Sequence, residues 1–309
     1  MAAARTGRPV PKAMLDAFPR YQLSMMAIMV SGADAEFGVS PNRALADSLS
    51  ARAKRAGTSV PYLERQLAWN AGRPSRAVAL QEERGTPQSM SDDVLAALTW
   101  DEDSTIAKRS AAGLSEWLRA HPSDSLTSDR ASALFYEGIW AFDRGDTATV
   151  MRARQSLAAL KPPTAKPWLR NLSVAYEQML GAYLAVERKS RDTRPRLVRL
   201  DSILSDAPAL DGQARTTLSS MLADLWERID DPTRALSANR RYERSLEWGR
   251  LSSTRIRRDA RLLERLGRPR EAIDAWRSYV ELRANAEPSL QPDLAQAKAN
   301  LARLEAKVR

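Results

Sequence analysis

The stretch LLERLGRPREAIDAWRSYVEL, Leu262–Leu282, contains two apolar runs separated by a Gly-Arg-Pro break. Gly267 can end a helix by adopting a left-handed backbone conformation at little steric cost, and Pro269 suits the first turn of the helix that follows. Ala272 lies five residues after the glycine and is small enough to let two helices approach closely. The stretch therefore predicts two antiparallel helices joined by a tight turn.

The same pattern occurs at three further breaks, where a turn residue is followed five positions later by a small or apolar residue. These breaks are 72–78 (GRPSRAV), 145–151 (GDTATVM) and 230–236 (DDPTRAL). The last two units begin 37 residues apart, which is near the period of about 34 residues found in helical repeats. The chain is therefore expected to consist of repeated helical pairs.

Composition favours helices along the whole chain. Ala, Leu and Arg dominate, aromatic residues make up only 6%, and no segment alternates with period two for long enough to predict a strand. Caps and breaks place the expected helices near 41–56, 60–71, 74–84, 91–100, 104–120, 129–144, 147–161, 167–188, 194–205, 212–229, 232–246, 252–266, 269–284 and 292–306.

Several classes of site are excluded by residue type. There is no cysteine, so the chain has no disulfide and no thiolate metal site, and a single histidine, His121, leaves little scope for imidazole chemistry. The strongest apolar run, Leu23–Val30, is far shorter than the roughly 18 residues that a membrane span requires. We expect no signal peptide, no cofactor, no metal site and no enzymatic activity.

Four short motifs are interpreted as structural. His121 precedes a proline and is expected to cap the end of a helix. The acidic run Asp101–Asp103 lacks the spacing of a calcium loop and precedes a helix. Arg144-Gly145-Asp146 lies in a repeat turn, and the glycosylation sequon at Asn171 falls inside a predicted helix.

Three of the tryptophans are expected to be part of the core. Trp140, Trp226 and Trp276 occupy apolar helical positions and are expected in the core, with their N–H groups bonded at its edge. Nucleic-acid binding would require aromatic side chains interleaved with basic ones, which only Tyr242, Trp248 and the arginines near them offer.

Positive charge is concentrated in two segments. The chain carries a net charge of +10, whereas residues 234–270 alone hold 12 arginines against four acidic residues, and residues 188–199 hold six basic residues against Asp192. On the predicted helix 252–266, the apolar face comprises Ile256, Ala260, Leu263 and Leu266. Arg255, Arg258, Arg261 and Arg265 lie on the opposing side, within about 120° at 100° per residue. These four arginines are the candidate partner-binding residues, because guanidinium groups bind carboxylates and phosphates in bidentate geometry.

The repeat pattern resembles the tetratricopeptide repeat family. The unit closest to the family signature has Ala260, Leu263, Gly267, Ala272 and Trp276 at the signature positions. The resemblance is good over 212–285, fair over 130–212 and weak before residue 90. It implies an all-α, right-handed α-solenoid of about six stacked helical hairpins, whose first helices line a concave groove that binds partners.

The C-terminal run also resembles the repeat-containing ends of certain bacterial serine/threonine kinases, although the chain has none of the kinase motifs. That resemblance implies a sensory or scaffolding segment of a signalling protein. We expect weakly repeat-like helical pairs over 1–90 and a repeat solenoid over 91–309 with a C-terminal capping helix from Pro292.

The function expected is that of a scaffold or regulatory module, which binds an acidic or extended protein segment in the groove. The alternative is an α-solenoid that binds RNA through the basic residues 234–270. A cytoplasmic location is expected, or the sensory end of a membrane-anchored signalling protein.

Overall fold

The structure, a computed structural model, describes residues 43–56, 61–80, 85–100, 104–123, 125–161, 167–206, 212–241 and 252–308. These segments are helical or turn, and apart from one isolated bridge between Ser125 and Lys161 they contain no β-structure. The predicted all-α fold is confirmed. The apolar run Leu23–Val30 lies outside the described residues.

The described helices follow the predicted order. They are α4 (Arg43–Arg55), α5 (Pro61–Asn70), α6 (Pro74–Ala79), α7 (Pro87–Trp100), α8 (Ser104–Ala120), α9 (Ser128–Asp143), α10 (Thr147–Ala159), α11 (Pro167–Glu187), α12 (Thr193–Asp206), α13 (Gly212–Arg228), α14 (Pro232–Arg240), α15 (Ser252–Arg265), α16 (Pro269–Leu282) and α17 (Gln291–Val308). A short 3₁₀ helix, Pro288–Leu290, precedes α17.

The start of α7 differs from the prediction. Ser91 was expected to cap this helix, but the helix begins at Pro87. Thr86 provides the cap instead, because its hydroxyl accepts the backbone N–H of Ser89 at 3.2 Å. The Ser91 hydroxyl lies inside the helix and donates to the carbonyl of Pro87 at 2.7 Å.

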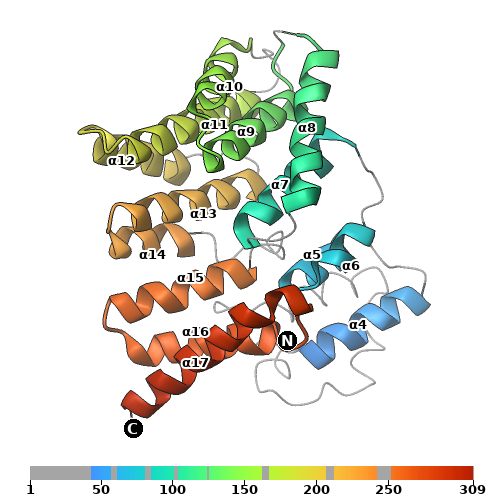
Figure 1. The fold of residues 1–309 in the computed structure, drawn as a ribbon, viewed down its shortest axis with the longest axis vertical. Helices are drawn as coiled ribbons and strands as arrows, with labels where there is room; N and C mark the ends of the chain where they lie inside the picture. Colours follow the sequence, from blue (N-terminus) through green and yellow to red (C-terminus); the bar gives the residue numbers. More distant parts are fainter. Residues whose placement is uncertain are drawn as a thin grey trace. The chain divides into compact units, whose positions relative to one another are not determined.

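The chain folds as two compact units, one of residues 1–82 with 240–309 and the other of residues 83–239. In the second unit the first helices of successive pairs pack in order, α7 on α9, α9 on α11 and α11 on α13. The second helices α8, α10 and α12 each pack on the first helix of the next pair, as can be followed in Figure 1. In the other unit α5 packs on α6, and α16 packs on both α15 and α17.

One turn geometry joins five of the helical pairs. The residue that ends the first helix has a positive φ in each, namely Gly72 (70°), Gly145 (73°), Lys189 (47°), Asp230 (60°) and Gly267 (68°). Its N–H donates to the carbonyl three residues back, and the next N–H donates to the carbonyl five residues back. These two bonds define the Schellman motif, which satisfies carbonyls left over at a helix end. The basic segment after α11 therefore keeps the repeat turn although its sequence departs from the pattern.

The residue five positions after the turn is buried in all four of the breaks identified in the sequence. Ala77, Val150, Ala235 and Ala272 each have no exposed surface, as close packing of the paired helices requires. A second small residue, seven positions before the turn, is buried in the pairs that begin with α9, α11, α13 and α15, where it is Gly138, Ala182, Ala223 and Ala260.

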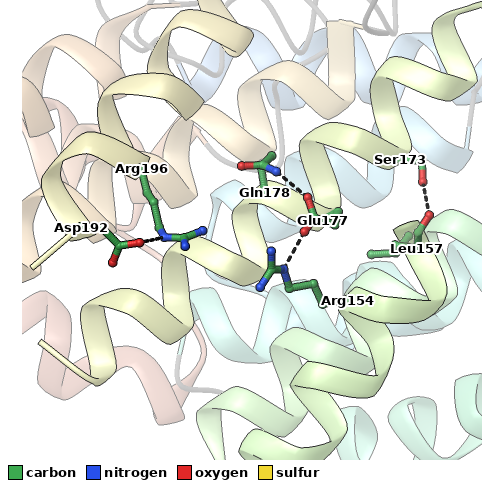
Figure 2. A network of polar contacts seen from close by, with 7 residues as sticks. All are labelled: Arg154, Leu157, Ser173, Glu177, Gln178, Asp192 and Arg196. Carbon is green, nitrogen blue, oxygen red and sulfur yellow. Dashed lines mark hydrogen bonds and ion pairs between the residues drawn. The ribbon is translucent and has the colours of Figure 1, made fainter. Parts of the chain in front are cut away.

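Polar contacts connect the pair α9–α10 to α11. In Figure 2 the Ser173 hydroxyl donates to the Leu157 carbonyl at 3.0 Å, and Arg154 Nε donates to Glu177 at 2.6 Å. Gly181 provides room for the Arg154 guanidinium, since a Cβ at residue 181 would lie 3.3 Å from Arg154 Nε. These contacts place α10 and α11 in register along their shared interface.

Contacts between residues far apart in sequence hold α5 and α6 to the C-terminal helices. The buried Asn70 side chain accepts the N–H of Ser253 at 3.2 Å, on α15. Beyond α16, the N–H of Glu287 donates to the Gly72 carbonyl at 2.8 Å, and its carboxylate accepts the Ser75 hydroxyl at 2.8 Å. The first compact unit is therefore assembled from both ends of the chain.

The predicted core position is confirmed for two of the three tryptophans, and the predicted N–H bond for Trp276 alone. Trp226 and Trp276 are buried, and Trp276 donates to Glu264 at 2.6 Å. Trp226 Nε1 has no hydrogen-bond partner among the described residues. Trp140 is only half-buried, and the Arg144 guanidinium lies over its ring, with Cζ 2.9 Å from the ring centroid.

Candidate functional site

Helix α15 carries the four arginines predicted to bind a partner. Its inner side packs through Ala260 and Leu263, which are fully buried, while Ile256 and Leu266 are half-buried. Arg257 lies on the side of α17 and pairs with Asp293 at 2.7 Å. The apolar positions and this ion pair fix the rotation of α15.

The four candidate arginines do not share one environment. Arg261 and Arg265 are exposed, whereas Arg255 and Arg258 are half-buried. Leu262 falls between Arg255 and Arg258 around the helix at 100° per residue, and it is fully buried. The N-terminal half of the arginine row is therefore partly covered, whereas its C-terminal half is exposed.

Around α15, several arginines of the basic segment 234–270 are held in ion pairs. Arg240 lies 2.7 Å from Asp259 and 3.9 Å from Glu271. Arg268 makes two hydrogen bonds to Glu271, at 2.5 and 2.6 Å, and Arg234 lies 3.8 Å from Asp231. These acids lower the positive potential around the arginines with which they pair.

Beneath α15 a buried polar cluster joins three helices. The hydroxyl of Tyr279 donates to Asp293, the same carboxylate that binds Arg257. Burial raises the pKa of Tyr279 to about 12, although the nearby Arg283 and Arg257 oppose the shift. The neutral hydroxyl therefore persists at physiological pH and supports the Asp293–Arg257 pair that orients α15.

A second arginine cluster, which sequence reasoning missed, lines a pocket of about 450 Å³ between α8, α9 and α10. Arg119, Arg130 and Arg152 line it, one from each helix, together with Glu137. These residues have no regular spacing, since they come from three different helices. Only packing brings them together, so no sequence pattern could have found them.

The motifs interpreted as structural have the following positions. His121 is exposed, and its ring stacks on that of Trp117 with the ring centroids 4.6 Å apart. Its Nδ1 lies 2.9 Å from the Trp117 carbonyl oxygen, so the predicted role at the helix end is confirmed. Gly145 lies in the repeat turn and Asn171 within α11, as predicted. Asp101–Asp103, Tyr242 and Trp248 lie outside the described residues.

The described segments contain neither a metal-binding cluster nor a membrane-spanning helix. No group of three or more His, Asp or Glu side chains there lies close enough together to hold a metal ion. No helix within those segments is both long enough and apolar enough to cross a membrane.

Comparisons with family models, with curated proteins and with solved structures found no match to this chain.

Proposed function

We propose that the chain is a non-enzymatic interaction module of the tetratricopeptide-repeat type, a right-handed α-solenoid that binds an acidic, extended segment of a partner protein. The observation that carries the proposal is the repeated Schellman turn, followed in four of the five turns by a fully buried alanine or valine five positions later. Recurrence of one turn and one packing position is what a stack of equivalent helical hairpins requires. The ordered packing of first helices α7, α9, α11 and α13 supports the same arrangement.

The α15 arginines supply the proposed recognition. Arg255 and Arg265 are ten residues apart, about 15 Å along a helix, so the row matches an extended segment with carboxylates at intervals. Exposed Arg261 and Arg265 can bind carboxylates, and the half-buried Arg255 and Arg258 lie in a less hydrated setting, where charged hydrogen bonds are stronger.

The alternative function for residues 234–270 is nucleic-acid binding. The ion pairs within that segment favour a protein partner instead. Arg234, Arg240, Arg257 and Arg268 are each paired with a carboxylate. Binding to a phosphate backbone draws on many cations at once, and arginines already paired contribute less to it. A short acidic segment needs only the few cations that α15 exposes.

The proposal can be tested by measuring the binding of two labelled probes of equal charge, an oligoglutamate and an oligouridylate. Their affinities are measured by fluorescence anisotropy at low and at high salt. We expect tighter binding of oligoglutamate and a loss of at least about tenfold in Arg261→Glu/Arg265→Glu, since each lost charged hydrogen bond weakens binding by about 1.5–3 kcal/mol. Arg270→Glu/Lys298→Glu is the matched control, because both side chains are exposed and lie off α15. Equal losses in both double variants, or preference for the oligouridylate with a steep salt dependence, would contradict it.

A further inference from the structure

The pocket between α8, α9 and α10 is lined by three arginines and one carboxylate, that of Glu137. Arg119 lies near the end of α8, Arg130 in the first turn of α9 and Arg152 within α10. Across the described part of the chain none of the three forms an ion pair, whereas many other arginines do. Asp146 attracts Arg152, but three arginines against the single Glu137 carboxylate leave the lining with an excess of positive charge. An anion in the cavity would offset that excess.

Two of the three guanidiniums, those of Arg130 and Arg152, are oriented by hydrogen bonds within the fold. Arg130 donates through Nη1 to the carbonyl of His121, and its buried Nε has no acceptor among the described residues. Arg152 donates through Nη2 to the Thr149 hydroxyl at 2.5 Å. A buried donor left without an acceptor is costly, and Arg130, which lines the pocket, carries such a donor.

The rest of the lining defines the shape of that ligand. Leu118, Leu134, Ala153 and Leu160 give the pocket an apolar part. Glu137 is the one acidic residue in the lining, and Ser115 donates to one of its carboxylate oxygens at 2.5 Å. Three arginines against one carboxylate leave a net charge of +2. The volume of about 450 Å³ lies within the range of about 300–1,000 Å³ that is usual for ligand sites.

We propose that this pocket is a second binding site, which takes a short peptide segment with two carboxylates flanking an apolar side chain. The carboxylates bind the guanidiniums of Arg119, Arg130 and Arg152, and the apolar side chain packs on Leu134 and its apolar neighbours. The charge of the segment balances that of the lining, and the unused Arg130 Nε gains an acceptor. The site does not depend on the function proposed for α15, because its residues belong to the other compact unit.

Isothermal titration with the peptide Ac-Glu-Leu-Glu-NH₂ tests the site, beside its neutral counterpart Ac-Gln-Leu-Gln-NH₂ and inorganic phosphate. The protein variant is Arg119→Gln/Arg152→Gln, whose positions are both exposed, so the fold is retained. The matched control is Lys108→Gln/Arg109→Gln, which removes the same charge from exposed positions on α8 outside the pocket. Amide NMR shifts in the full chain show where the peptide binds.

The site predicts that the acidic peptide binds the wild type and the control alike, and that its affinity falls at least about tenfold in Arg119→Gln/Arg152→Gln. Shifts should cluster at residues 118–137 and 149–160. Equal weakening in the control would mean that only long-range charge acts, and equal binding of the neutral peptide would mean that the arginines take no part. Either result, or binding of phosphate without binding of the peptide, would overturn the proposal.

Discussion

The Arg283 side chain occupies the space into which a side chain at Gly72 would project. A Cβ at residue 72 would lie 2.6 Å from Arg283 Nη1 and 2.8 Å from the Cβ of Ala286. Arg283 is buried and also donates to the Ser253 hydroxyl at 3.2 Å. The turn of the α5–α6 pair is thus closed by residues more than two hundred positions later in the chain.

Gly72→Ala should destabilise the protein by about 2–5 kcal/mol. The left-handed backbone costs about 1–2 kcal/mol in any residue with a Cβ, and overpacking against Arg283 adds about 1–3 kcal/mol. Gly267→Ala is the control, because Gly267 has nearly the same φ, 68°, but nothing within 4 Å of the added methyl. Urea unfolding of both variants separates the two costs, and equal losses would show that the contact with Arg283 does not matter.

Ala272→Leu should cost about 1–3 kcal/mol of unfolding free energy, because the added atoms have no space at a fully buried position between α15 and α16. The exposed Ala299 of α17 serves for comparison, and Ala299→Leu should change stability by less than about 0.5 kcal/mol. Thermal and urea denaturation measure both. A mild effect at residue 272 would argue against close packing in this helical pair.

Asn70→Ala should loosen the attachment of α5 to α15. The substitution removes the acceptor of the Ser253 N–H and leaves a buried donor unsatisfied, at a cost of about 1–3 kcal/mol. Hydrogen exchange should quicken in α5 and at the start of α15. Ser75→Ala, which removes only an exposed hydrogen bond to Glu287, should leave those rates nearly unchanged; similar exchange in the two variants would refute the role given to Asn70.

Stability should decline at alkaline pH in a manner that depends on Tyr279. Its pKa is about 12 in the folded protein and about 10 when unfolded, so between these values the unfolded chain releases the proton first. Stability is therefore constant below pH 10 and falls by about 2–3 kcal/mol as pH rises through this window. Tyr279→Phe should reduce the slope of unfolding free energy against pH above pH 10. An unchanged slope would place Tyr279 in a more hydrated setting.

Most helix positions were predictable because their causes are local. A glycine able to adopt a positive φ, a proline in the first helical turn and a small residue at the fifth position act within a few residues of one another. For this reason the helices around Gly145 and Gly267 lie where the sequence predicts them. The start of α7 differs from the prediction because two residues with capping hydroxyls, Thr86 and Ser91, lie close together in the sequence. In the structure Thr86 caps the helix, and Ser91 lies inside it.

The candidate site was predictable only in part. Helical periodicity correctly grouped Arg255, Arg258, Arg261 and Arg265 on one helix, but exposure depends on what covers that helix, and the burial of Leu262 shows that half of the row is covered. The pocket arginines were invisible in the sequence, because Arg119, Arg130 and Arg152 lie on three helices that meet only on packing.

By itself, the sequence determined the all-α class, the helix order and the recurring turn, since each arises from backbone conformations and side chains within a few residues. Only the tertiary structure decided that Asn70 and Gly72 join Ser253 and Glu287, that Leu262 is covered, and that three distant arginines share a pocket. Such contacts depend on which helical faces bury most apolar surface together, a free energy summed over the whole fold, which no local pattern encodes.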